Sequence, residues 1–174
     1  MPTAKTKEIE GFIIENVPAH SADIAQYVAE SFSISRQSVN RHIRKLIANR
    51  VLREEGNTRS KKIFLLDQVL VDKTFKIIPE LSEDVVFRND IAPLIKDLAL
   101  SENIIKRFQF CFTEMFNNAI DHSEGTIISV ALRANPLELN CTINDNVLGY
   151  LKKFKPALIL RMSEWQFLNY QKAS

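Results

Sequence analysis

Residues 101–123 contain the feature that most limits how this chain can fold. Apolar side chains recur there at three- and four-residue spacing and cover more than half of a helix circumference: Ile104, Ile105, Phe108, Cys111, Phe112, Met115, Phe116, Ala119 and Ile120. This pattern predicts one helix that is mostly buried. Glu114, Asn118 and Asp121 nevertheless share one narrow stripe of it, with His122 at the edge. Polar groups on a buried helix are costly unless they are paired, hydrated or liganded, so the stripe is a functional candidate.

The spacing Glu-x-x-x-Asn-Ala-x-x-His, formed by Glu114, Asn118, Ala119 and His122, resembles the N-box of the gyrase, chaperone and histidine-kinase (GHKL) ATPases, whose domain is the Bergerat fold. The resemblance implies that Asn118 binds the Mg²⁺ that bridges ATP phosphates. It also implies that Glu114 orients or deprotonates the attacking water. Magnesium takes oxygen ligands and keeps several waters, which suits an amide and a carboxylate one turn apart. The alternative is a polar stripe that caps a core or lines an interface.

Two strands are expected after this helix, at 126–132 and 137–143, with a turn at Asn135-Pro136. Helix, strand, turn, strand is the order that a Bergerat core requires. The second strand leads into a loop where the resemblance implies that Asp145 contacts adenine and that Gly149 matches the second glycine of the adenine-binding motif. Val147 replaces the first glycine, and a β-branched residue disfavours the positive φ that glycine allows.

The residues after Gly149 contain no further glycine. In the GHKL family a flexible lid and a second glycine-rich box follow, and their backbone N–H groups bind the phosphates. Here we expect an amphipathic helix through Leu158, Met162, Trp165 and Leu168. The prediction is therefore a partial ATPase domain, from a truncated, frameshifted or degenerate relative, that binds ATP and Mg²⁺ weakly or not at all.

The first 66 residues predict three helices and a hairpin. The first helix ends before Pro18, and Ser21 and Ser35 are expected to cap the second and third. Strands are expected at 51–55 and 61–66 around the turn 56–60. This order, with the words Ile-Ser-Arg-Gln-Ser-Val-Asn-Arg-His-Ile-Arg-Lys-Leu from residue 34 onward, resembles a winged helix-turn-helix of bacterial regulators.

Positive charge is concentrated in the same region, because residues 33–62 hold 9 Lys/Arg against 2 Asp/Glu. A helix fits the major groove of DNA, where Arg, Asn and Gln read base edges, and basic side chains on a wing meet phosphates. Double-stranded DNA is the expected partner. A solvated basic face, or a winged helix used for protein contacts, is the alternative. The predicted DNA-binding residues are Arg36, Gln37, Asn40, Arg41, Arg44, Lys45, Arg59, Lys61 and Lys62.

Residues 67–100 are expected to connect the two parts. A strand is predicted at 69–77 and a helical segment at 81–98, which Pro93 should end or kink. No Gly/Ser-rich linker is present, so the domains are expected to be in contact. The predicted class is α+β: a winged helix-turn-helix at 1–66, a connecting segment at 67–100, and a partial Bergerat-type α/β sandwich at 101–174.

Composition limits the remaining classes. With 25% charged residues, two cysteines, and neither a signal peptide nor an apolar run that could span a membrane, the chain is expected to be cytoplasmic. The leading hypothesis is a DNA-binding transcriptional regulator with an incomplete ATP-binding domain and no enzymatic activity. One alternative is an ATP/Mg-dependent phosphohydrolase or protein kinase whose C-terminal part is missing. The other is an interaction module that binds a partner protein or forms a homodimer.

Overall fold

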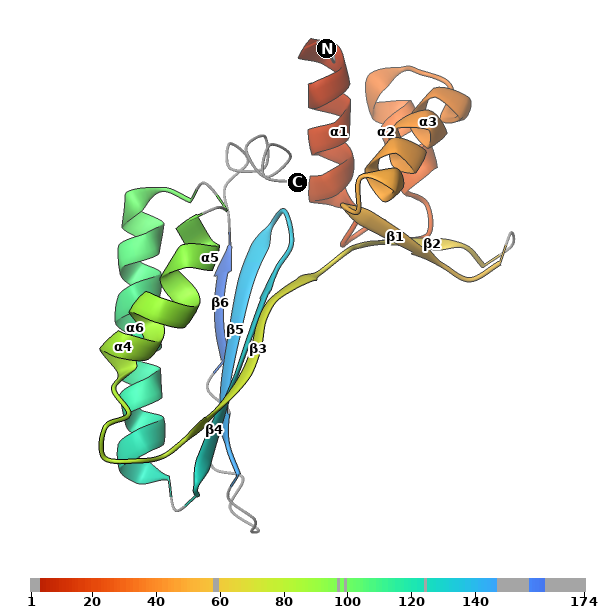
Figure 1. Cartoon of the computed structure of the whole chain (residues 1–174). Coiled ribbons are helices and arrows are strands. Elements are labelled where there is room, and N and C mark those ends of the chain that lie inside the picture. The colour runs from red at the N-terminus through yellow and green to blue at the C-terminus, as the bar shows by residue number, and fades with distance from the viewer. Residues whose placement is uncertain are drawn as a thin grey trace. The chain divides into compact units, whose positions relative to one another are not determined.

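The computed structural model describes residues 4–57, 60–96, 98, 100–123, 125–146 and 157–161. Helices and strands are mixed, which confirms the α+β class (Figure 1). The chain divides into two compact units, residues 1–67 with 135–137, and residues 68–134 with 138–174. The first unit contains α1 (Ala4–Asn16), α2 (Ile24–Phe32), α3 (Arg36–Ala48), β1 (Leu52–Glu55) and β2 (Lys62–Leu65).

The three helices and the hairpin of the first unit form around one apolar core, as predicted. Ile13, Val28 and Val39 are fully buried between the helices. The strands β1 and β2 pair antiparallel, from Leu52 opposite Leu65 to Glu55 opposite Lys62. The hairpin is fastened to the helices by backbone as well, because the N–H of Ile63 donates to the carbonyl of Ser21 at 2.8 Å.

The two predicted helix caps have different outcomes. Ser35 is confirmed, since its Oγ accepts a hydrogen bond from the N–H of Ser38 at 3.2 Å. The prediction for Ser21 is wrong, because α2 begins at Ile24 and has Asp23 at its N-cap. Ser21 lies in the turn before the helix, and its carbonyl is committed to β2. Sequence alone does not reveal this strand contact.

The second unit is a four-stranded antiparallel sheet covered on one face by helices (Figure 1). Its strands are β3 (Gln68–Lys76), β4 (Ile127–Ala134), β5 (Glu138–Asp145) and β6 (Ala157–Arg161), in the spatial order β3-β4-β5-β6. The covering elements are α4 (Glu83–Val86), the π-helix η1 (Phe87–Ile91), α5 (Ala92–Lys96) and α6 (Glu102–His122). The predicted long helix and the paired strands after it are confirmed.

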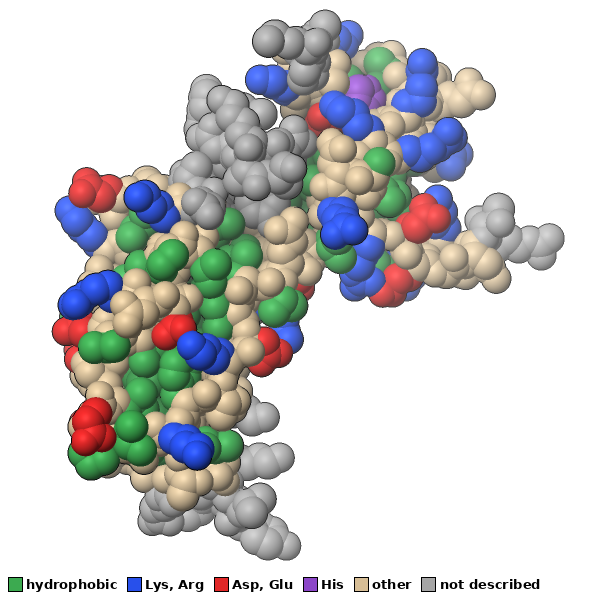
Figure 2. All heavy atoms as spheres, in the orientation of Figure 1, with side chains coloured by type: hydrophobic (Ala, Val, Ile, Leu, Met, Phe, Trp, Pro, Cys, Tyr) green, Lys and Arg blue, Asp and Glu red, His purple; other side chains and the backbone are tan. Residues whose placement is uncertain are grey.

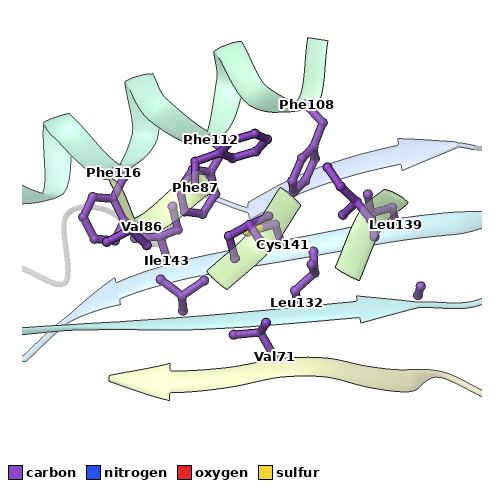
Figure 3. Close-up of a cluster of buried hydrophobic side chains, with 14 of the residues drawn as sticks. Val71, Val86, Phe87, Phe108, Phe112, Phe116, Leu132, Leu139, Cys141 and Ile143 are labelled. Atoms are coloured by element: carbon purple, nitrogen blue, oxygen red, sulfur yellow. The ribbon is translucent and has the colours of Figure 1, made fainter. Parts of the chain in front are cut away.

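A column of phenylalanines joins α6 to this sheet (Figure 3). Phe108, Phe112 and Phe116 are four residues apart on the helix, and each is 0% exposed. The ring centroids of Phe108 and Phe112 lie 6.3 Å apart, and those of Phe112 and Phe116 lie 5.6 Å apart. The ring centroid of Phe87, in η1, lies 5.6 Å from that of Phe112. Burial is narrower than predicted, however. Ile104, Ile105, Met115, Ala119 and Ile120 are only half-buried, because this helix covers the sheet with one face.

The segment 67–100 contributes to this unit rather than only spanning a gap. β3 pairs with β4 along its length as an edge strand, with a bulge between Val69 and Val71. Pro93 does not end the helical segment, which continues to Lys96. The π-helix comes just before it, where the N–H of Ala92 donates to the carbonyl of Phe87. This wider turn precedes the residue that cannot donate a helical hydrogen bond.

The predicted C-terminal amphipathic helix is wrong at its start. Leu158 lies in β6 and pairs with Cys141 of β5. Leu158 packs against the core while Ile159 is 53% exposed, which is the two-residue alternation of a strand. Met162, Trp165 and Leu168 lie outside the described residues. Within the described part of the chain, no helix is both long and apolar enough to cross a membrane.

We expect Phe116→Ala to lower the free energy of unfolding by about 3–5 kcal/mol, because it empties a fully buried ring site. The matched control is Phe110→Ala on the same helix, whose ring is 66% exposed; its effect should stay within about 0.5 kcal/mol. Urea unfolding followed by circular dichroism measures both. Equal losses of unfolding free energy in the two variants would contradict the packing of α6 on the sheet through the face that contains Phe116.

Candidate functional site

One face of α3 presents polar and basic side chains at helical spacing. Arg36, Asn40 and Arg44 are four residues apart and therefore share a stripe along the helix. The two arginines are exposed and Asn40 is half-buried; Gln37 and Arg41 are exposed beside them. Lys and Arg side chains are frequent on the visible face of this unit (Figure 2).

A hollow of about 480 Å³ opens between this stripe and the hairpin. Ile24, Ile43 and Ile63, all buried, form an apolar floor. Its other lining residues are Ser21, Ala22, Ala25, Arg36, Asn40, Arg44, Ile47, Glu54 and Lys61. Polar groups from both α3 and the hairpin therefore meet over an apolar surface.

Strand alternation decides which hairpin side chains reach the hollow. Leu52 and Ile63 are buried on the inner face, and Glu54 lies on that same face, opposite Ile63. Glu54 Oε2 and Lys61 Nζ are 2.5 Å apart, so an ion pair lines the hollow. Lys62 lies opposite Glu55, on the outer face.

The outer face of the hairpin has its own charged contacts. Arg53 pairs with Glu55, and its guanidinium lies 4.8 Å from the centre of the Phe64 ring. These side chains do not line the hollow. The adjacent residues Glu54 and Glu55 therefore lie on opposite faces of β1.

The other flank of α3 is held by a buried carboxylate that sequence reasoning missed. Glu10 of α1 is 3% exposed. Its carboxylate accepts hydrogen bonds from Lys45 Nζ at 2.7 and 3.0 Å, and His42 Nδ1 lies 3.3 Å away. The available signal was the spacing of Glu10 from Ile13 and Ile14, which places an acid on the inner face of α1.

The predicted DNA-binding residues therefore separate into groups. Arg36, Asn40, Arg44 and Lys61 meet around the hollow, and Gln37 and Arg41 lie on the exposed side of α3. Lys45 is tied to α1, and Lys62 lies on the opposite hairpin face. Arg59 lies outside the described residues.

The polar stripe of α6 is on the exposed side of its helix. Glu114, Asn118, Asp121 and His122 are all exposed, whereas the phenylalanine column faces the sheet. An exposed carboxylate or amide is already hydrated, so the stripe requires no ligand to offset burial. Among the residues that the structure describes, no three His, Cys, Asp or Glu side chains are grouped as a metal site.

Asp145 is the last residue of β5. It lies opposite Ile128, at the end of the sheet where β4 begins after α6. It continues the alternation of Cys141 and Ile143, so its backbone position is on the helix-facing side. The next residue braces the loop between α6 and β4, because Asn146 Oδ1 accepts from the N–H groups of Thr126 and Ile127 at 2.8 and 3.1 Å. Val147 and Gly149 lie outside the described residues.

The two cysteines are both free thiols. Cys141 is fully buried between the sheet and α6, and burial raises the pKa of its thiol to about 12. The thiolate form is therefore negligible near neutral pH. Cys111 is half-buried on α6, and neither residue is in a disulfide.

The chain matches no family model, no curated protein and no solved structure.

We expect Lys45→Met to lower the free energy of unfolding by about 1–3 kcal/mol, because it removes the main partner of a buried carboxylate. Arg44→Met is the matched control one residue away. It removes the same charge from an exposed side chain and should change stability by about 0.5 kcal/mol or less. Thermal unfolding of both variants tests this, and equal losses would mean that Glu10 does not depend on Lys45.

Proposed function

We propose that the first unit is a winged helix-turn-helix that binds double-stranded DNA through α3, and that the chain regulates transcription. The observation that carries this proposal is the stripe of Arg36, Asn40 and Arg44 beside the hollow, with Gln37 and Arg41 exposed next to it. Arg has the donor geometry to bind guanine in the major groove, and Asn and Gln have that for adenine. An apolar floor behind them suits a thymine methyl group.

The dimensions support the same proposal. Residues 36 and 44 are eight positions apart, which is about 12 Å along a helix. Base pairs are stacked about 3.4 Å apart, so the stripe spans between three and four of them. A helix enters the major groove with this geometry.

The distribution of uncompensated charge also supports it. Arg36, Arg41 and Arg44 have no carboxylate within ion-pair distance in the described part of the chain, whereas Lys45 and Lys61 are paired with Glu10 and Glu54. The charges left for an anionic ligand therefore include three on one helix face. A surface that served only for solvation would not need base-reading residue types among them.

We expect Arg44→Ala and Arg41→Ala each to weaken binding to duplexes selected by the protein from a random pool. Loss of a base contact should cost about 5- to 150-fold in affinity, and loss of a phosphate contact should reduce the salt slope by about one. Fluorescence anisotropy across salt concentrations distinguishes the two. Arg107→Ala removes an exposed arginine of α6 and should bind like the wild type. The proposal fails if all three variants bind alike.

A second candidate function belongs to the second unit. We propose that it is a partial Bergerat-type domain that binds Mg-ATP weakly and does not hydrolyse it. The observation that favours this proposal is the position of Asp145, the residue expected to contact adenine. It lies on the helix-facing side of β5, at the end of the sheet where β4 begins after α6. In this proposal Asn118 contributes to Mg²⁺ binding and Glu114 lies nearby. A platform for a partner protein or a second copy of the chain is the competing interpretation of the same surface.

Calorimetry with ATP and Mg²⁺ should give dissociation constants in the millimolar range or weaker, and an ATPase assay should show no turnover. The reason is that phosphoryl transfer depends on positioned charges in a site that excludes water, whereas Glu114 and Asn118 are exposed. Asn118→Ala should remove the binding heat, and Asn117→Ala is the neighbouring amide control. Turnover that disappears only in Asn118→Ala would contradict the non-hydrolytic part of this proposal.

A further inference from the structure

We propose that Glu54 is a specificity-determining residue of the α3–hairpin surface. Its carboxylate holds Lys61 and repels DNA phosphates from the hollow, so that the hollow is left to base edges. This inference rests on the proposed DNA-binding function and concerns how that same surface discriminates between sequences.

The position of Glu54 in β1 directs its side chain to the hollow. Glu54 lies on the inner face of β1, opposite the buried Ile63, and this position directs an acid toward a surface that is otherwise basic. Its Oε2 lies 2.5 Å from Lys61 Nζ, and both side chains are about half exposed, at 49% and 47%. An ion pair this exposed contributes little to stability. The fold therefore does not account for a carboxylate here.

The pair does change what the hollow can bind. Without Glu54, the cations lining the hollow would be Arg36, Arg44 and Lys61, which together favour a phosphate. Glu54 engages one of these cations and adds a like charge against any phosphate that enters. Phosphate contacts supply essentially all of non-specific DNA binding. A repulsive group at this position therefore weakens binding to all sequences, while base contacts from Asn40 and the arginines remain available.

The hairpin contains a matched control for this argument. Glu55 is the next residue of β1, is also exposed, and pairs with Arg53 on the outer face. Glu54→Gln and Glu55→Gln make the same change in net charge on the same strand. Only the first change affects a side chain that lines the hollow. A general effect of net charge would appear equally in both variants.

The experiment measures binding of the full chain to a random-sequence duplex by fluorescence anisotropy over a range of salt concentrations. We expect E54Q to bind about fivefold more tightly near 0.1 M salt, with a slope of log K against log salt steeper by about one, as for one added phosphate contact. E55Q should match the wild type. The double variant E54Q/K61Q should return to the wild-type slope, because Lys61 is the cation that E54Q releases.

Three results would overturn the inference: no change in E54Q, an equal change in E54Q and E55Q, or a double variant that keeps the steeper slope. Thermal unfolding of each variant verifies that the fold is intact, which the exposure of both acids leads us to expect. Failure of the proposed function itself gives a different result, since the wild type would then bind no duplex even at the lowest salt concentration.

Discussion

The arrangement of α3 depends on one buried carboxylate. Glu10 is almost completely shielded from water, and an ion in that position without partners is strongly destabilising. Lys45 and His42 supply the partners, so the flank of α3 that carries them must face α1. Helical periodicity then turns Arg36, Asn40 and Arg44 away from α1 and toward the hairpin. The ion pair between the buried Glu10 and the partly exposed Lys45 thus affects which basic residues of α3 remain available to a ligand.

The two units treat polar groups differently, and this difference bears on their functions. In the first unit, polar side chains from α3 and β1 converge on a hollow with an apolar floor. In the second, the phenylalanine column of α6 forms the contact with the sheet and leaves Glu114 and Asn118 on the exposed side. The polar stripe is thus accommodated without a ligand. The first unit consequently provides the stronger geometric case for binding.

Local patterns in the sequence predict most of the elements, and contacts between distant residues explain the errors. Helical spacing at Phe108, Phe112 and Phe116 and two-residue alternation in β4 and β5 are local properties, so those elements are predictable. Ser21 fails as a cap because its carbonyl binds a residue of β2, and Leu158 joins a strand because β5 offers it an open edge. The basic residues of the candidate site are visible in the sequence, but their carboxylate partners are not. Glu10 is 35 positions from Lys45, and no local pattern connects them.

These carboxylates determine which of the positive charges between residues 33 and 62 remain without an ion pair. The sequence predicts DNA contacts from both the third helix and the wing, which each contain several Lys and Arg residues. In the structure, two cations of the hairpin region are engaged, Arg53 by Glu55 and Lys61 by Glu54, whereas α3 retains three arginines without a described ion pair. Among the described residues, free positive charge therefore favours α3, since Lys62 is the hairpin cation that remains without an ion pair. In our proposal the hairpin contributes a wall of the hollow, and Glu54, which lines that hollow, disfavours the entry of DNA phosphates. In this proposal α3 supplies both the attraction to DNA and the base contacts, while Glu54 of β1 reduces the binding that depends on phosphates alone.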